Sequence, residues 1–163
     1  MCPRRHGDSR GERRAAKTYR PSPLAYRLMS SIEELIPHRA PMRWLEALID
    51  CTETTATATT MFTANHFAVA DSIVIETALV ECMAQTIAAA LGQRMHASGK
   101  LGATNNGMLA AVSNFKIHSS PPMNLELTIE VREVKRLGPM LMIAGRISCG
   151  TRLIATGELS LYA

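Results

Sequence analysis

The chain has 163 residues, 47% hydrophobic and 20% charged, a composition typical of one globular domain with an apolar core. No apolar run is long enough to cross a bilayer, so we expect no membrane partner. The net charge of +4 is uneven, because residues 1–28 carry eight Lys or Arg against two acidic residues and residues 29–163 carry ten against twelve. We therefore predict a basic, disordered arm over residues 1–28 and a single domain over residues 29–163 without a nucleic-acid partner.

The four cysteines are far apart in the sequence and form no Cys-x-x-Cys pair. This spacing indicates neither a zinc site nor a disulfide framework. Cys51 and Cys82 lie among apolar residues, as reduced thiols of a core do. Reduced thiols favour a reducing compartment, so we expect the protein in the cytoplasm.

The first predicted elements are a short helix, a turn and two strands. Ser30 or Ser31 can cap a helix that ends at Pro37. Residues 37–42 predict a rigid turn, because a proline stands near each end. Residues 44–51 and 54–63 are expected to be extended, the second because Thr alternates there with Ala, Met and Phe.

The next elements are a long apolar helix and four more strands. After an irregular stretch over residues 64–75, Ser72 or Thr77 can cap a helix that runs to about Ala97 and is apolar nearly all round. Strands are predicted over residues 108–118, 125–134, 140–148 and 153–162. One apolar helix needs an apolar surface around it. We therefore predict an α+β fold in which a six-stranded antiparallel sheet wraps one long central helix, with an edge strand that a dimer would cover.

Four polar side chains are candidates for a functional site. Glu81 interrupts the apolar helix, where a carboxylate is costly to bury without a catalytic or hydrogen-bonding reason. Gln85 follows one turn later and can orient it. His66 follows a strand-like segment and is a candidate base. His38 is expected to hydrogen-bond the backbone of its turn, and it is the alternative base if His66 points away.

Three segments together resemble the hot-dog-fold 3-hydroxyacyl–[acyl carrier protein] dehydratases, in particular the divergent aryl-polyene-type branch. The resemblance covers about residues 30–163. The first segment, Leu35-Ile36-Pro37-His38-Arg39-Ala40-Pro41-Met42, is similar to the family's Leu-Pro-His-Arg-x-Pro. The second, Asn65-His66-Phe67, stands where the family has Gly-His-Phe-Pro-Gly. The third, Val80-Glu81-Cys82-Met83-Ala84-Gln85, is similar to Leu-Glu-Ala-Met-Ala-Gln.

The resemblance implies a homodimer that converts 3-hydroxyacyl chains on acyl carrier protein into trans-2-enoyl thioesters, in fatty-acid or related polyene biosynthesis. It implies His66 as the base for the C2 proton and Glu81 as the acid for the departing hydroxyl, contributed by opposite subunits. It places the thioester carbonyl at the helix start near Glu76 and Thr77, with Gln85 and His38 close to the substrate. It implies no metal or organic cofactor.

Two other functions fit the same sequence. A hot-dog acyl thioesterase would use the helix carboxylate with water and would not need His66. A non-catalytic acyl-binding hot-dog subunit is also compatible, because Asn65 and Ala68-Val69 replace the family's glycine and Pro-Gly around the histidine. Arg132, Lys135 and Arg136 either meet an acidic carrier protein or form a solvated charge cluster.

Overall fold

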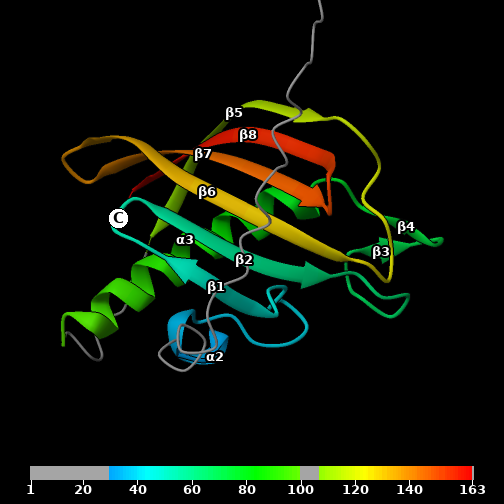
Figure 1. Cartoon of the computed structure of the whole chain (residues 1–163), viewed down its shortest axis with the longest axis horizontal. Coiled ribbons are helices and arrows are strands. Elements are labelled where there is room, and N and C mark those ends of the chain that lie inside the picture. The colour runs from blue at the N-terminus through cyan, green and yellow to red at the C-terminus, as the bar shows by residue number, and fades with distance from the viewer. Residues whose placement is uncertain (1–29, 100–106, 163) are drawn as a thin grey trace, which may run out of the picture.

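The computed structural model describes residues 30–99 and 107–162, so the predicted arm over residues 1–28 lies outside the described residues (Figure 1). The elements are α2 (Ile32–Leu35), β1 (Ala47–Cys51), β2 (Thr55–Met61), β3 (Val69–Ala70), β4 (Ile73–Val74), α3 (Ala78–Ala97), β5 (Met108–Ile117), β6 (Glu126–Leu137), β7 (Met140–Cys149) and β8 (Arg152–Tyr162).

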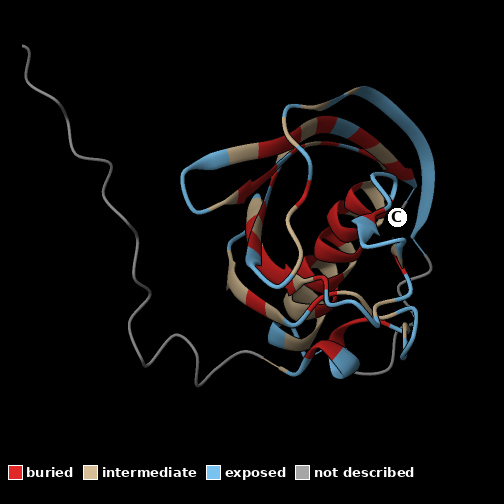
Figure 2. Ribbon diagram, turned by 90° about the vertical axis from the view of Figure 1, so that its right-hand side faces the viewer, coloured by how far each residue is buried: buried red, intermediate tan, exposed pale blue. Residues whose placement is uncertain are grey.

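Six strands form one antiparallel sheet in the order β1-β2-β6-β7-β8-β5. The sheet curves around α3, which contacts β1, β2, β6 and β7 on the inner face and α2 on another side (Figures 1 and 2). This arrangement is the hot-dog fold, and the predicted fold class is confirmed. Within the described residues no helix, α3 included, is long and apolar enough to cross a membrane.

The core forms where alternate residues of the strands meet α3. Leu127 and Ile129 of β6 point inward with the period of two that their sequence predicts, and both are fully buried. The side chain of Met83 in α3 packs against β7 at Gly145, where an added Cβ would lie 2.6 Å from the methionine Sδ. The absence of a side chain at Gly145 therefore lets α3 approach the sheet closely. The face of α3 that carries Met83 is thus covered by the sheet, and a site can form only on another face of the helix.

The strands after α3 differ from their predicted ranges by one to three residues, β6 for example ending at Leu137 and not at residue 134, and two differences before α3 are more informative. The stretch predicted as irregular contains the β3–β4 hairpin, in which Asp71 and Ser72 have φ of 50° and 63°, as a two-residue type I′ turn requires. The first strand begins at Ala47 and not near Trp44, because the backbone N–H of Trp44 donates to the side chain of Gln85 and not to a neighbouring strand. The end of α3 at Ala97 is as predicted.

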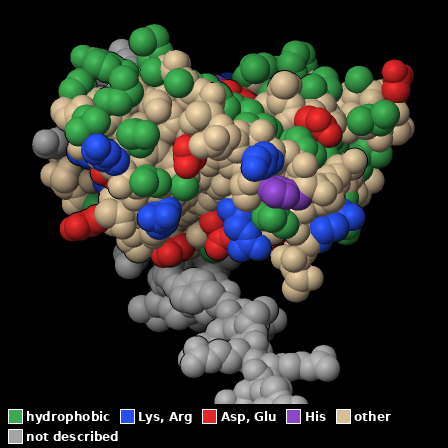
Figure 3. Space-filling model, turned by 90° about the horizontal axis from the view of Figure 1, so that it is seen from above, with side chains coloured by type: hydrophobic (Ala, Val, Ile, Leu, Met, Phe, Trp, Pro, Cys, Tyr) green, Lys and Arg blue, Asp and Glu red, His purple; other side chains and the backbone are tan. Residues whose placement is uncertain are grey.

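The edge strand β5 is uncovered in the single chain. Every residue from 108 to 114 is exposed, including Met108 at 63%, Leu109 at 41% and Val112 at 43% (Figure 2). Figure 3 looks onto this side of the molecule and shows hydrophobic side chains at the surface among charged ones. A long edge with apolar side chains is one that proteins ordinarily cover.

Candidate active site

Glu81 lies in the first turn of α3, with its carboxylate held by a neighbour on the same helix. Its Oε1 accepts a hydrogen bond of 2.8 Å from Nε2 of Gln85, four residues on. Nε2 of His38 lies 3.6 Å from the same oxygen, within ion-pair range but longer than a hydrogen bond. The Glu81 side chain is 34% exposed. The expectation of a buried carboxylate is therefore wrong for the single chain, because the helix face that carries Glu81 is not covered by the chain's own sheet.

Gln85 connects the helix to the loop that follows α2. Its side chain is fully buried, and its Nε2 donates to Oε1 of Glu81 and, at 2.7 Å, to the carbonyl of Met42. Its Oε1 accepts the backbone N–H of Trp44 at 2.9 Å. Both amide hydrogens and the amide oxygen are thus used, which fixes the orientation of the amide. The predicted contact between Gln85 and Glu81 is present.

His38 turns toward Glu81 and does not support its own turn. The guanidinium of Arg39 donates from Nη1 to the carbonyls of Ile36 and His38, each at 2.9 Å. The expected role of His38 in bonding the turn is therefore wrong, because Arg39 has the longer reach and more donors. Nδ1 of His38 is buried and has no hydrogen-bond partner among the described residues.

A cavity of about 170 Å³ opens beside Glu81. Glu81, Gln85 and Leu91 lie on one face of α3, and the ten-residue step from Glu81 to Leu91 corresponds to about 15 Å along the helix. Small side chains between these positions leave room, so a narrow, largely apolar channel leads away from a carboxylate. The lining residues are Pro37, His38, Glu81, Ala84, Gln85, Ala88, Leu91, Gly107, Leu109 and Leu161.

His66 lies in the turn after β2, in a different environment. Its ring makes edge contacts with the rings of Trp44 and Phe62, with centroids 5.7 Å and 4.8 Å away. Its Nδ1 accepts the backbone N–H of Ala68 at 3.0 Å, so the ring proton of the neutral form is on Nε2. Burial lowers the pKa of His66 from its usual value. Within this chain His66 forms no hydrogen bond or ion pair with Glu81, and it does not line the cavity.

Glu76 and Thr77 are exposed at the start of α3, as a site for a thioester carbonyl would need. The three N–H groups that follow, those of residues 78–80, each bond to the carbonyl three residues earlier. The N–H groups of Glu76 and Thr77 have no partner among the described residues, so they are the donors available at this helix terminus.

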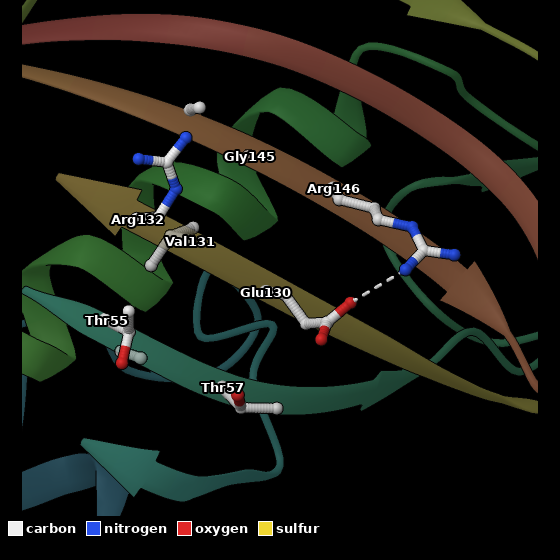
Figure 4. Close-up of a pocket in the computed structure, with 9 residues that line it drawn as sticks. Thr55, Thr57, Glu130, Val131, Arg132, Gly145 and Arg146 are labelled. Carbon is white, nitrogen blue, oxygen red and sulfur yellow. Dashed lines mark hydrogen bonds and ion pairs between the residues drawn. The ribbon is translucent and has the colours of Figure 1, made fainter. Parts of the chain in front are cut away.

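A larger hollow of about 470 Å³ lies on the outer face of the sheet. Figure 4 shows Arg132 on β6 and Arg146 on the neighbouring β7, with Glu130 turned toward Arg146 at 3.4 Å. Arg136, further along β6, is paired with Glu133. This hollow is not lined by a histidine. The smaller cavity at Glu81 is therefore the better candidate for acid–base chemistry.

No cysteine of residues 30–99 and 107–162 lines the cavity. Cys82 follows Glu81 but points into the core, where burial raises the pKa of its thiol. Burial also raises the pKa of Cys51. Within the described part of the chain, no three His, Cys, Asp or Glu side chains are grouped so that they could hold a metal ion.

The curved sheet and the enclosed helix place this chain among the hot-dog proteins. Residues 30–163 match the model of the ApeP-like family, which is described as ApeP dehydratase, and the chain belongs to this family. The family is one of dehydratases, enzymes that eliminate water from their substrates. The predicted resemblance to a divergent branch of hot-dog dehydratases is thereby confirmed.

Solved structures show the same fold at low sequence identity. The dehydratase heterocomplex ApeI:P from Xenorhabdus doucetiae has a chain with a TM-score of 0.74 and 22% identity, over 82% of this chain and 90% of that one. Thioesterase superfamily member 2 from Mus musculus has a TM-score of 0.62 and 12% identity, over 86% and 97%. The PaaI protein of E. coli has a TM-score of 0.57 and 13% identity, over 71% and 81%. A comparison with curated proteins gives no match.

Proposed function

We propose that this protein eliminates water from 3-hydroxyacyl thioesters carried by acyl carrier protein and releases trans-2-enoyl thioesters, in fatty-acid or related polyene biosynthesis. The observation that carries the proposal is the cavity in which Glu81 meets an apolar channel along α3. An acyl chain fits such a channel because its walls are largely apolar, and we propose that C2 and C3 of the chain lie beside the carboxylate. Membership of a dehydratase family supports the same reaction.

The reaction needs three kinds of group, and we propose a candidate for each. A proton must leave C2 and a hydroxyl must leave C3, for which we propose Glu81 and His66 as the acid–base pair. Developing charge on the thioester oxygen needs fixed donors, for which we propose the N–H groups of Glu76 and Thr77. His38 and Gln85 complete the surroundings of Glu81.

We further propose that the site is completed by a second hot-dog chain. The exposed edge of β5 supports this, because Leu109 lines the cavity and is also 41% exposed at the edge. A second copy paired at β5 would cover this side chain and bring its own His66 toward the cavity of the first. A related hot-dog chain in place of the second copy is the alternative, as the ApeI:P heterocomplex illustrates for that protein.

If a second copy pairs at the edge of β5, a charge placed on that edge should prevent the pairing. Val112→Lys should turn a dimer into a monomer in light scattering after gel filtration, since a charge would enter the pairing edge. Val134→Lys, at a valine that is 53% exposed on β6, is the matched control and should leave the dimer intact. A wild-type protein that is monomeric at all concentrations and still active would contradict the shared site.

The reaction itself is tested with purified full-length protein and 3-hydroxyacyl thioesters of several chain lengths on acyl carrier protein. Enoyl absorbance and free thiol are followed together, with Glu81→Gln as the inactive control. Enoyl product without free thiol supports the proposal. Release of thiol would identify a thioesterase. If neither product forms at any chain length, the protein is an acyl-binding subunit. Either result overturns the proposed dehydratase activity.

A further inference from the structure

We propose that Glu81, and not a histidine, takes the C2 proton in this enzyme, and that His38 is a positioning residue for its carboxylate. The inference rests on the proposed dehydration and replaces the acid–base pair of Glu81 and His66 with Glu81 alone, so that His66 serves only as a hydrogen-bond donor. It follows from which atoms of these three side chains are already hydrogen-bonded and which are free.

His66 has no free lone pair with which to accept a proton. A neutral imidazole carries a hydrogen on one nitrogen and a lone pair on the other. Because Nδ1 accepts the N–H of Ala68 at 3.0 Å, its lone pair is occupied and the hydrogen is on Nε2. The lowered pKa of His66 keeps this neutral form dominant at pH 7. His66 therefore offers only a hydrogen-bond donor, which suits the thioester oxygen or the departing hydroxyl but not a proton on C2.

Glu81 has the opposite arrangement. Its Oε1 is an acceptor for Nε2 of Gln85, and the second amide hydrogen of Gln85 is already given to Met42. Gln85 cannot rotate its amide without also losing the N–H of Trp44. The carboxylate is thus held by one oxygen, and Oε2 has no partner among the described residues. A fixed carboxylate with one free oxygen beside an apolar channel is a proton acceptor in position.

His38 completes the support from the loop after α2. A hydrogen on its buried Nδ1 would be a donor without an acceptor, so the ring hydrogen is on Nε2. That N–H faces Oε1 of Glu81 at 3.6 Å. Such contacts are often long in the absence of substrate and shorten when it binds. Among the described groups that face Glu81, Gln85 and His38 are the polar ones, while Cys82 points into the core and the other cavity walls are apolar.

The elimination then balances on a single carboxyl group. Oε2 of Glu81 takes the proton from C2, and the electron pair of that C–H bond becomes the C2–C3 double bond. The C3–O bond breaks with its electrons on the oxygen. The same carboxyl group returns the proton to this oxygen, which leaves as water, so Glu81 ends as it began. One carboxyl group reaches both positions because C2 and C3 are neighbours, and Nε2–H of the His66 that the proposed second copy brings to the cavity stabilises the oxygen on which charge develops.

The test compares variants that keep an N–H but cannot accept a proton. The amide nitrogen of glutamine lies where Nε2 of histidine lies, so His66→Gln retains the donor and removes any base. We expect kcat/KM of His66→Gln to exceed that of His66→Ala by about tenfold or more, as for a lost transition-state donor. The pH profile of kcat/KM for His66→Gln should keep the acid-side midpoint of the wild type, because this variant loses no proton acceptor of the reaction.

His38 is tested in the same way. His38→Gln should recover most of the activity that His38→Ala loses, and only His38→Ala should move the midpoint of the acid side of the pH profile. Thermal melts of all four variants control for folding. Were His66→Gln as inactive as His66→Ala, or were its acid-side midpoint displaced, His66 would be the proton acceptor and the inference overturned. Unchanged activity and midpoint in His38→Ala would remove His38 from the site.

Failure of this inference is distinguishable from failure of the proposed function. A wild-type protein that forms no enoyl product contradicts the dehydratase itself. A wild-type protein that forms enoyl product, together with an inactive His66→Gln, contradicts only the assignment of the proton acceptor to Glu81.

Discussion

His38 and His66 both lie in turns beside the central helix, yet they keep different neighbours. His38 directs Nε2 at a carboxylate and leaves Nδ1 without a partner among the described residues. His66 packs against two aromatic rings, and its Nδ1 accepts a hydrogen bond from the backbone N–H of Ala68. The neighbours of an imidazole, and not the segment of sequence that carries it, therefore decide whether it can accept a proton, donate one or hold another group in place.

The strongest way to test the difference between the two turns is to remove the carboxylate that only one of them contacts. Glu81→Gln keeps the size and the hydrogen bond from Gln85 but cannot take a proton. We expect dehydration to fall by about 10³-fold or more, within the range of acid–base groups, with the melting temperature little changed. Single-turnover assays of enoyl formation measure this. A variant with a tenth of wild-type activity would show that Glu81 is not the proton acceptor.

Gln85 joins the helix to the loop of His38 and forms no hydrogen bond with His66, so its removal should act mainly on the region of His38 and Glu81. Gln85→Ala leaves the Trp44 N–H and the Met42 carbonyl without their partner in a partly buried place. We expect a loss of about 2–3 kcal/mol in the free energy of unfolding, measured by urea titration, and a large fall in kcat. Gln93→Ala, on the same helix, removes a single longer bond to Ser30 and is the matched control. Equal losses in both variants would contradict the proposed anchoring.

Arg39 supports the turn of His38 from outside the cavity and should have a smaller effect. Arg39→Met keeps the apolar part of the side chain but loses both bonds to the carbonyls of Ile36 and His38. We expect about 1 kcal/mol less stability and a kcat several-fold lower, because His38 is then less well placed. Arg43→Met, which loses a partly exposed pair with Glu33 and a bond to the carbonyl of Leu45, serves as the comparison and should leave kcat unchanged.

The smallest expected effect is a pH dependence of stability from the His66 turn. Burial makes the folded-state pKa of His66 lower than its unfolded value, so the unfolded chain binds the proton more readily. The contribution of His66 to stability is therefore complete above the unfolded pKa, about 6.5, and is lost as the pH falls through the folded pKa. The melting temperature should decline on acidification below about pH 6.5, and less steeply in His66→Gln. An identical decline in that variant would assign the effect to another group.

Much of the fold follows from local patterns. The alternation of β6 places Leu127 and Ile129 in the core, and an apolar helix of this length is stable only when a sheet encloses it. Glu81 and Gln85 were predicted to meet because they are one turn apart on that helix, and they do. These features are predictable because each depends on residues close together in the chain.

The contacts that give the candidate site its chemistry are of another kind. Arg39 and His38 are neighbours, and either could have bonded the carbonyls of their turn; the choice depends on where α3 brings Glu81. The N–H of Trp44 meets Gln85 across 41 residues of sequence. Such partners are set by packing, which no local pattern records.

By itself the sequence determined the enclosed helix, the order of the strands along the chain and the pairing of Glu81 with Gln85, because backbone periodicity fixes which side chains share a face. Only the tertiary structure decided that β5 is the uncovered edge, that His38 and not His66 faces Glu81 within one chain, and that Nδ1 of His66 is already bonded. The physical reason is that a hydrogen bond depends on the position and direction of two groups, and for distant residues only the packed chain sets both.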